Sequence, residues 1–303
     1  MSHLDASKLF SVKGLVAVVT GGGSGLGRTM ALTLDANGAS KVFVVGRREN
    51  ALKETASLAV NGTITPVTGD VASKESLEKV YNAVASQTAH VDLLVANSGT
   101  MGPKAQPPTK SDGTKPSISE VRDELMAVPM EDFTNVFHVN VTGAYYTVVA
   151  FLPLLDAANK KRPVPDPKVL SLPRPQVVIT SSIAGFNRQV PFSYSYSTSK
   201  AAVTHLIKML STSLASYQIR VNGIAPGLYH SELAEPLYKI RGIEGKGTSD
   251  GSFPMEQIPA TRGGGEEDIG GLILWMAGTA GGYLNGSIIV TDGGRLGVVP
   301  STY

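Results

Sequence analysis

A short apolar run that enters a glycine-rich turn constrains this fold more than any other feature of the sequence. Residues 15–20, Leu-Val-Ala-Val-Val-Thr, are typical of a parallel strand that is covered on both faces. The run enters Gly-Gly-Gly-Ser-Gly-Leu-Gly at residues 21–27, and a helical pattern follows to about residue 38. A glycine loop alone can be simple punctuation between elements. Between a strand and a helix, however, it predicts a nucleotide site.

Each glycine of this turn has an expected task. Gly21 would close the turn tightly, and Gly27 would let the helix approach the strand. Gly23 and Ser24 would face a pyrophosphate group, where the unpaired N–H groups at the helix N-terminus can bind phosphate.

The second expected strand, residues 41–45, ends at Gly46, Arg47 and Arg48. In a sheet of this kind the corner faces the adenosine ribose, where an acid binds the 2′-hydroxyl of NAD and an arginine accommodates the 2′-phosphate of NADP. The acid is absent here, so Arg47 predicts NADP(H). The alternative is that both arginines simply begin a solvated helix.

Further apolar, β-branched runs alternate with helical patterns along the chain, which predicts an α/β fold with a parallel sheet. Strands are expected at residues 63–68, 91–96, 177–181, 219–224 and 287–290, and helices at 73–86, 130–156, 201–216 and 266–277. A length of 303 residues with 33 glycines fits one large domain, residues 1–303.

Three irregular segments interrupt this pattern. Residues 100–119 and 159–175 are rich in proline and have no periodicity, so each is predicted to be an insertion. The first either is a mobile surface excursion or borders the substrate pocket. Residues 228–259 are rich in loops and are expected to form a substrate loop or lid.

A tyrosine and a lysine lie one helical turn apart at Tyr196 and Lys200. A phenol has a pKa of about 10, and a nearby ammonium is expected to lower it toward the working range of an acid–base group. Ser182, at the end of the preceding strand, could hold a substrate oxygen beside the phenol. This spacing also recurs by chance, so the motif alone is weak.

Composition excludes several functions. With no cysteines, the chain has no disulfides, no thiolate metal site and no cysteine nucleophile. The net charge of +2 gives no support for a nucleic-acid partner. We expect no membrane segment either, because no stretch reaches about 18 apolar residues and residues 1–10 lack a signal core. A cytoplasmic protein is the expectation.

Taken together, these motifs resemble the short-chain dehydrogenase/reductase family from about residue 13 to residue 296. The residues that carry the resemblance are Thr20, Gly21, Gly25 and Gly27, Asp70 and Val71, Asn97, Ser98 and Gly99, Asn140, Ser182, Tyr196, Lys200, Pro226 and Gly227, and Asp292, Gly293 and Gly294. The resemblance implies a Rossmann-type, doubly wound parallel sheet of seven strands in the order 3-2-1-4-5-6-7.

The resemblance also implies roles for a catalytic set. Tyr196 would be the general acid for carbonyl reduction, and Ser182 would bind the substrate oxygen. Lys200 would bind the nicotinamide ribose and lower the Tyr196 pKa, and Asn140 would position a water between Lys200 and solvent. No metal is implied. The implied cofactor-binding residues are Gly21, Gly23, Ser24, Leu26, Arg47, Asp70, Val71, Asn97, Gly99, Tyr196, Lys200, Pro226 and Leu228.

Two departures from the family pattern stand out. An alanine, Ala96, replaces the first asparagine of the usual Asn-Asn-Ala-Gly, for which a small structural effect is expected. Ser182 and Tyr196 are about one position farther apart than is common, which leaves open whether Tyr194 competes for the acid role. Because position 198 is a threonine, Tyr194 lacks a lysine four residues on, and Tyr196 is favoured.

The function predicted from these residues is NADPH-dependent reduction of a ketone or β-ketoacyl carbonyl on a small-molecule substrate. The alternatives are an alcohol or sugar dehydrogenase that works oxidatively, and a family member that senses nucleotides or was recruited to another step without turnover. Apolar residues around the helix that begins near Tyr196 suggest a second buried face. In the resembling family that helix pairs across a two-fold axis, so a homotetramer is predicted, with a dimer as second choice.

Overall fold

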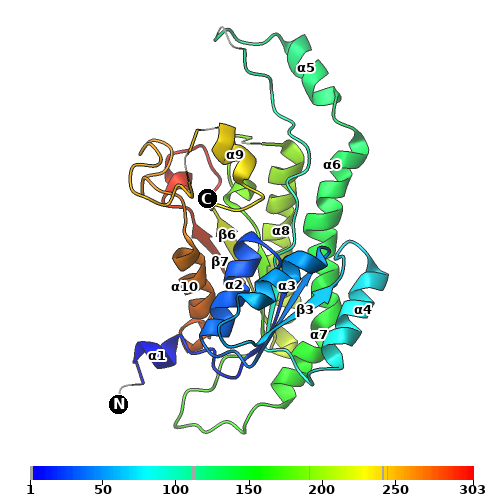
Figure 1. Cartoon of the computed structure of the whole chain (residues 1–303), viewed down its shortest axis with the longest axis vertical. Helices are drawn as coiled ribbons and strands as arrows, with labels where there is room; N and C mark the ends of the chain where they lie inside the picture. Colours follow the sequence, from blue (N-terminus) through cyan, green and yellow to red (C-terminus); the bar gives the residue numbers. More distant parts are fainter. Residues whose placement is uncertain (1–2, 111–112, 191, 241, 244) are drawn as a thin grey trace.

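The computed structural model describes residues 3–110, 113–190, 192–240, 242–243 and 245–303. Its centre is a parallel sheet of seven strands in the order β3-β2-β1-β4-β5-β6-β7 (Figure 1), which confirms the predicted order. The strands are β1 (Val16–Thr20), β2 (Lys41–Gly46), β3 (Ile64–Thr68), β4 (Leu93–Ala96), β5 (Gln176–Thr180), β6 (Arg220–Pro226) and β7 (Ile288–Thr291). The chain order reverses between β1 and β4, and such switch points hold ligands at the carboxyl ends of the strands.

Helices cover both faces of this sheet. The α-helices are α1 (Ala6–Leu9), α2 (Gly25–Ala36), α3 (Glu49–Ser57), α4 (Lys74–Ala85), α5 (Ile118–Met126), α6 (Met130–Phe137), α7 (Ala144–Lys160), α8 (Tyr194–Ser213), α9 (Glu235–Ile240) and α10 (Glu266–Ala277). A π-helix, η1 (His138–Gly143), joins α6 to α7, and short 3₁₀ turns are η2 (Ile183–Gly185), η3 (Ala215–Tyr217), η4 (Thr279–Gly281) and η5 (Arg295–Gly297).

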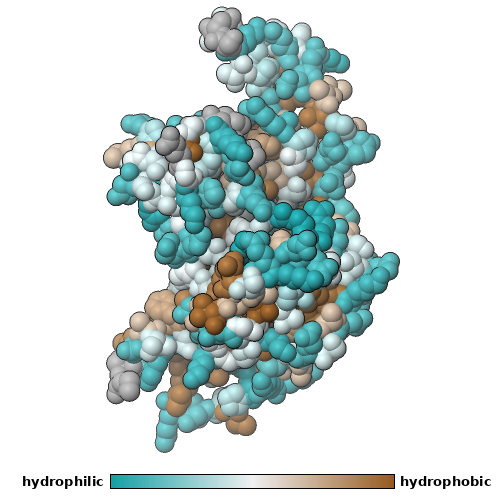
Figure 2. Space-filling view, viewed as in Figure 1, coloured by the Kyte–Doolittle hydropathy of each residue, from teal (hydrophilic) through white to brown (hydrophobic). Residues whose placement is uncertain are grey.

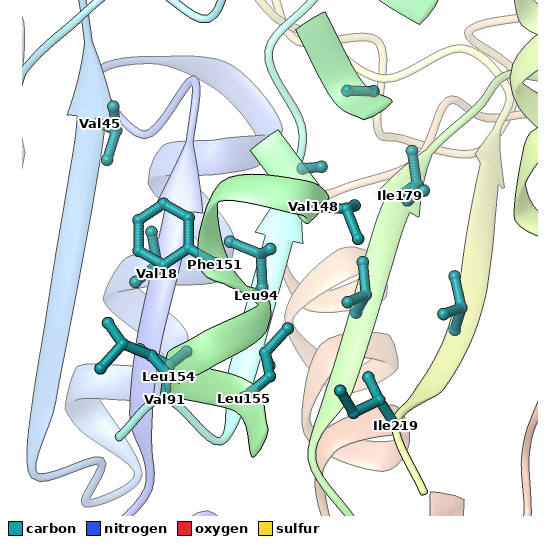
Figure 3. Packing of buried hydrophobic residues seen from close by; sticks show 14 of the residues in the cluster. Val18, Val45, Val91, Leu94, Val148, Phe151, Leu154, Leu155, Ile179 and Ile219 are labelled. Atoms are coloured by element: carbon teal, nitrogen blue, oxygen red, sulfur yellow. The ribbon is translucent and has the colours of Figure 1, made fainter. Parts of the chain in front are cut away.

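The continuous apolar strands are explained by burial on two sides. In β1, Val16 and Val18 pack into a core with α4, α7 and α8, whereas Ala17 and Val19 pack into a second core with α2, α3 and α10. Figure 3 shows the first core, where Phe151 of α7 lies over the strands. Successive strand residues point to opposite faces, so both must be apolar.

The sequence predicts a long helix over residues 130–156 that is interrupted or bent near Gly143 and Pro153. In the structure, the run from α6 to α7 is interrupted by the π-helix, which ends at Gly143, and it continues through Pro153 to Lys160. Among the described residues, this run, Met130–Lys160, alone has the length and apolarity to cross a membrane. Val148, Phe151 and Leu155 are buried against the sheet, so core packing accounts for part of that apolarity.

Helices α5 and α9 are absent from the sequence prediction. Ser117 and Glu120 form a capping box that begins α5, which projects from the body on an arm of the chain (Figure 1). The shorter α9 lies in the expected substrate loop. Residues 161–175, by contrast, contain no helix or strand. Figure 2 shows that the viewed face, arm included, is mostly hydrophilic with small separate hydrophobic groups.

Candidate active site

The glycine turn between β1 and α2 is shaped for a close backbone approach. Gly21 has a φ of 68°, which favours glycine. A Cβ on Gly27 would lie 2.2 Å from the Gly21 carbonyl oxygen, so only glycine fits there. Arg28 Nη2 donates to the Gly23 carbonyl at 2.7 Å, and Thr55 Oγ1 donates to the Gly22 carbonyl at 2.9 Å. Side chains of α2 and α3 therefore hold the loop by its carbonyl oxygens.

A cavity of about 800 Å³ extends from this turn along the carboxyl ends of the strands to α8. It is lined by every cofactor-binding residue predicted from the sequence, which are Gly21, Gly23, Ser24, Leu26, Arg47, Asp70, Val71, Asn97, Gly99, Tyr196, Lys200, Pro226 and Leu228. Ser182 also lines it, but Asn140 does not. The glycine cradle, the start of α2 and the arginines at one end fit a nicotinamide dinucleotide, whose phosphates need backbone donors and cations.

Asn97 ties three strand ends together. Its Nδ2 donates to the Thr20 carbonyl at 3.2 Å, and its Oδ1 accepts from Thr180 Oγ1 at 3.0 Å. The backbone N–H of Asn97 donates to Thr20 Oγ1 at 3.0 Å. This asparagine therefore fixes the ends of β1, β4 and β5 against one another beneath the cavity.

The Tyr196 and Lys200 pair lies on α8, which begins at Tyr194 with Ser193 as its N-cap. The Lys200 ammonium donates to the Thr180 carbonyl at 2.8 Å and lies 5.8 Å from the centroid of the Tyr196 ring. Ser182 sits at the end of β5, where its hydroxyl accepts from the Ala184 N–H at 3.1 Å. The structure thus brings Ser182, Tyr196 and Lys200 to one wall of the cavity.

The pKa values of this pair differ from the expectation. Burial raises the pKa of Tyr196, and a hydrogen bond with Ser182 opposes that shift. Burial also lowers the pKa of Lys200 from 10.5 to about 8. The predicted lowering of the Tyr196 pKa by Lys200 was wrong for this structure, because loss of water around the phenol outweighs the nearby ammonium.

Asn140 is buried within the π-helix, where its side chain is fully occupied. Its Nδ2 donates to the Thr100 carbonyl at 2.9 Å and to Ser199 Oγ at 3.0 Å, and its Oδ1 accepts from the Thr100 N–H at 2.8 Å. A Cβ on Gly99 would lie 3.1 Å from Asn140 Oδ1 and 3.6 Å from Lys200 Nζ. Asn140 therefore fixes residues 99–100 beside Lys200, and its role toward a water stays a prediction.

Tyr194, the competing phenol, lies away from the cavity. It is 41% exposed and is not among the cavity-lining residues, whereas Tyr196 is. The longer loop between Ser182 and Tyr196 is held by other segments. The Phe186 carbonyl accepts from the Thr302 N–H at 2.9 Å, Asn187 forms an antiparallel bridge with Ser301, and Ser193 forms a parallel one with Ala105.

Several cavity residues have no motif in the sequence. The cavity lining also includes five apolar residues and one arginine: Met101, Val139, Ile183, Phe192, Leu233 and Arg295. Glu232, in the expected substrate loop, lines the cavity too and pairs with Arg48. Except for Val139, these residues lie outside the predicted helices and strands, and the fold brings them to the cavity.

Comparisons with known proteins agree with this geometry. A family model described as short chain dehydrogenase matches residues 15–241. The short-chain dehydrogenase/reductase PhomF of Diaporthe leptostromiformis is 42% identical over 301 residues, which are 99% of this chain and 97% of that protein. The rhamnolipids biosynthesis 3-oxoacyl-[acyl-carrier-protein] reductase of Pseudomonas aeruginosa is 30% identical over 288 residues, covering 94% of this chain and 97% of that protein.

A solved structure also resembles this chain in its fold. The RhlG/NADP active-site complex of Pseudomonas aeruginosa superposes with a TM-score of 0.76 at 29% identity, covering 95% of this chain and 98% of that chain.

Proposed function

Since this chain belongs to the short-chain dehydrogenase/reductase family, we propose that it is an NADPH-dependent reductase that converts a ketone or β-ketoacyl carbonyl to an alcohol. The observation that carries the proposal is the placement of Ser182, Tyr196 and Lys200 on one wall of a cavity whose other end holds the glycine turn and Arg47. A nicotinamide cofactor and a small substrate would thus meet beside the phenol.

The residues of this wall can each perform one part of a reduction. A reduced nicotinamide supplies a hydride to the carbonyl carbon. Ser182 would orient the carbonyl oxygen, and Tyr196 would donate its phenolic proton to that oxygen as the C–O double bond becomes single. The Lys200 ammonium would stabilise the phenolate left behind, which regains a proton from solvent.

The protonated phenol is consistent with the proposed direction, reduction. Because burial raises the Tyr196 pKa, the side chain is protonated at neutral pH, which is the form that a general acid requires. The oxidative alternative would instead need the phenolate as base.

The choice of NADPH rests on two arginines. Arg47 and Arg48 line the cavity at the end of β2, where an acid would be expected for NAD. A related protein supports the same choice, because RhlG forms a complex with NADP and superposes on most of this chain.

The substrate class is proposed from the cavity lining. Met101, Val139, Ile183 and Phe192 line the cavity together with the polar Ser182 and Asn187, so we propose a substrate with an apolar body around its reacting carbonyl. The 3-oxoacyl-[acyl-carrier-protein] reductase among the relatives makes β-ketoacyl thioesters the first candidates. Homotetramer assembly and a cytoplasmic location stay predictions.

The test is a substrate panel. NADPH oxidation is followed by its absorbance with β-ketoacyl thioesters and with apolar and polar ketones, and NADH is compared at the same concentrations. We expect turnover of an apolar carbonyl with NADPH. Faster turnover of alcohols with NADP⁺ across the same pH range would support the oxidative alternative, and a preference for NADH would contradict the cofactor assignment.

A further inference from the structure

An ion pair joins the two rims of the cavity at its cofactor end. Arg48 Nη2 lies 2.6 Å from Glu232 Oε2, and the same nitrogen donates to Ser24 Oγ at 3.2 Å. Arg48 is the N-cap residue of α3, Ser24 ends the glycine turn, and Glu232 lies between β6 and α9. All three residues line the cavity. One guanidinium therefore links the adenosine corner, the phosphate turn and the substrate loop.

The carboxylate of Glu232 is an anion bound to an arginine at this corner. The end of β2 is where the fold places the adenosine ribose, and an arginine there accommodates a 2′-phosphate. Arg47 and Arg48 at this corner can both receive the phosphate, and of these two only Arg48 already holds a carboxylate. Arg28 is held by Glu54 through two contacts, at 3.0 and 2.9 Å, while Arg47 makes no ion pair with any residue that the structure describes.

The Arg48–Glu232 ion pair is weak enough for a phosphate to replace the carboxylate. Its side chains are 63% and 58% exposed, so water screens the attraction and the net free energy of the pair is small. A phosphate offers more charge and three acceptor oxygens, and an arginine can bind it through two parallel hydrogen bonds. Phosphate should therefore replace the carboxylate on Arg48.

From this geometry we propose that Glu232 is a cofactor-specificity residue, whose carboxylate competes with the 2′-phosphate of NADPH for Arg48. The proposal rests on the proposed use of NADPH. It adds that an acid from the substrate loop, 184 positions away in sequence, sets the affinity for that phosphate. NADH, which lacks the phosphate, leaves the Arg48–Glu232 pair intact.

The same exchange would reach the substrate side of the cavity. The Ser231 carbonyl accepts from the N–H groups of Ala234 at 3.0 Å and Glu235 at 2.9 Å, so Glu232 lies in a turn that continues into α9. Leu233 and Ala234 in this turn line the cavity. Loss of the Arg48 contact would free the turn from the adenosine corner and loosen this part of the substrate wall.

The first experiment measures dissociation constants for NADPH and NADH by fluorescence titration of the full chain and of Glu232→Gln. The expected result is NADPH binding tighter by about two- to fivefold, the range for an exposed ion pair, and NADH binding unchanged. The matched control is Glu235→Gln, which removes the same charge three positions on from a side chain that pairs with Lys239. The control should leave both constants unchanged.

A double variant isolates the contact. In an Arg48→Met background, Glu232→Gln should no longer tighten NADPH, because the competition has no target. Hydrogen exchange of residues 232–238 should be faster with NADP⁺ than with NAD⁺ in the wild-type chain, and this difference should vanish in Glu232→Gln.

The outcomes separate this inference from the proposed function. If the wild-type chain prefers NADPH but Glu232→Gln binds it no more tightly, the inference is wrong and the proposed function stands. An equal gain in Glu235→Gln would also overturn it, because a general field effect would then explain the result. A wild-type chain that prefers NADH overturns the cofactor assignment and the inference together.

Discussion

At the scale of single residues, the phenol and the ammonium on α8 affect each other less than their spacing suggests. Four positions on a helix place Tyr196 and Lys200 on one face, and the structure has them there. Spacing gives no measure of burial, however. Because both groups are buried, each is shifted toward its neutral form, so the Tyr196 pKa rises and the Lys200 pKa falls. The sequence thus predicts the pair but not the direction in which the Tyr196 pKa is shifted.

The acid role of Tyr196 is tested by removing one oxygen atom. Tyr196→Phe keeps the ring and removes the only proposed proton donor, so kcat should fall by about 10²-fold or more while NADPH still binds. Tyr194→Phe is the matched control and should retain activity, because Tyr194 lies outside the cavity wall. Steady-state rates with cofactor titrations check both. Normal turnover in Tyr196→Phe together with loss in Tyr194→Phe would assign the role to the other phenol.

Lys200 predicts a pH dependence. Its pKa of about 8 means that the side chain is an ammonium below that pH and neutral above it. Since the ammonium stabilises the phenolate formed during reduction, kcat should decline as the pH rises through about 8, by up to about tenfold per pH unit. The measurement is kcat at saturating NADPH between about pH 6 and pH 10, with circular dichroism to exclude unfolding. A profile that stays flat to pH 10 would show that this proton does not matter.

At the scale of elements, local pattern predicts what is regular and covered on both faces. All seven strands appear within about two residues of their expected bounds, because β-branched apolar runs between turns have few alternatives. Helix α5 was missed, although Ser117 and Glu120 have the spacing of a capping box. The π-helix around Asn140 has no local pattern, because packing against residues 99–100 and Ser199 determines it.

Another unpredicted element is the pairing of residues 300–302 with the loop that follows Ser182. Tyr303 packs edge-on against Phe186, with ring centroids 5.4 Å apart, and Arg188 N–H donates to the Pro300 carbonyl at 2.8 Å. An aromatic pair of this kind contributes about 0.5–1.5 kcal/mol beyond area burial. Residues 300–303 thus brace a loop whose Asn187 and Phe192 line the cavity.

Tyr303→Ala should therefore loosen the substrate side and spare the cofactor side. We expect the KM for the carbonyl substrate to rise by about two- to tenfold, with the dissociation constant for NADPH unchanged. Tyr283→Ala removes an equal side chain that is fully exposed and serves as the control. An unchanged KM, or an equal loss of NADPH affinity, would contradict a bracing role.

At the scale of the whole molecule, the cavity is assembled from segments that local patterns do not connect. The glycine turn, the strand ends and α8 could be predicted, because each has its own motif. The Arg48–Glu232 contact could not, because residues on two different loops meet only when the sheet is complete. The same limit applies to the apolar substrate wall, which explains why the sequence predicts the reaction type in more detail than the substrate.

Exposed apolar side chains on α7 and α8 mark the surface where the predicted subunit contact can be tested. Tyr145 and Val149 on α7 and Met209 on α8 are 40%, 37% and 56% exposed. Leu206 on α8 packs partly against the core, so a charge there would disturb folding as well. Met209 is the better position for a charge, because the buried contact of α8 with the sheet is formed by Val203 and Ile207.

Met209→Glu should convert the predicted homotetramer, or a dimer, into smaller species, because two charges would face each other across a two-fold contact and lose water there. Leu58→Glu is the matched control, since Leu58 is 52% exposed at the end of α3, away from both helices. Light scattering at micromolar concentration gives the mass of each variant, and thermal unfolding shows whether the fold is kept. An active wild-type monomer, or a Met209→Glu variant with the wild-type mass, would contradict pairing through α8.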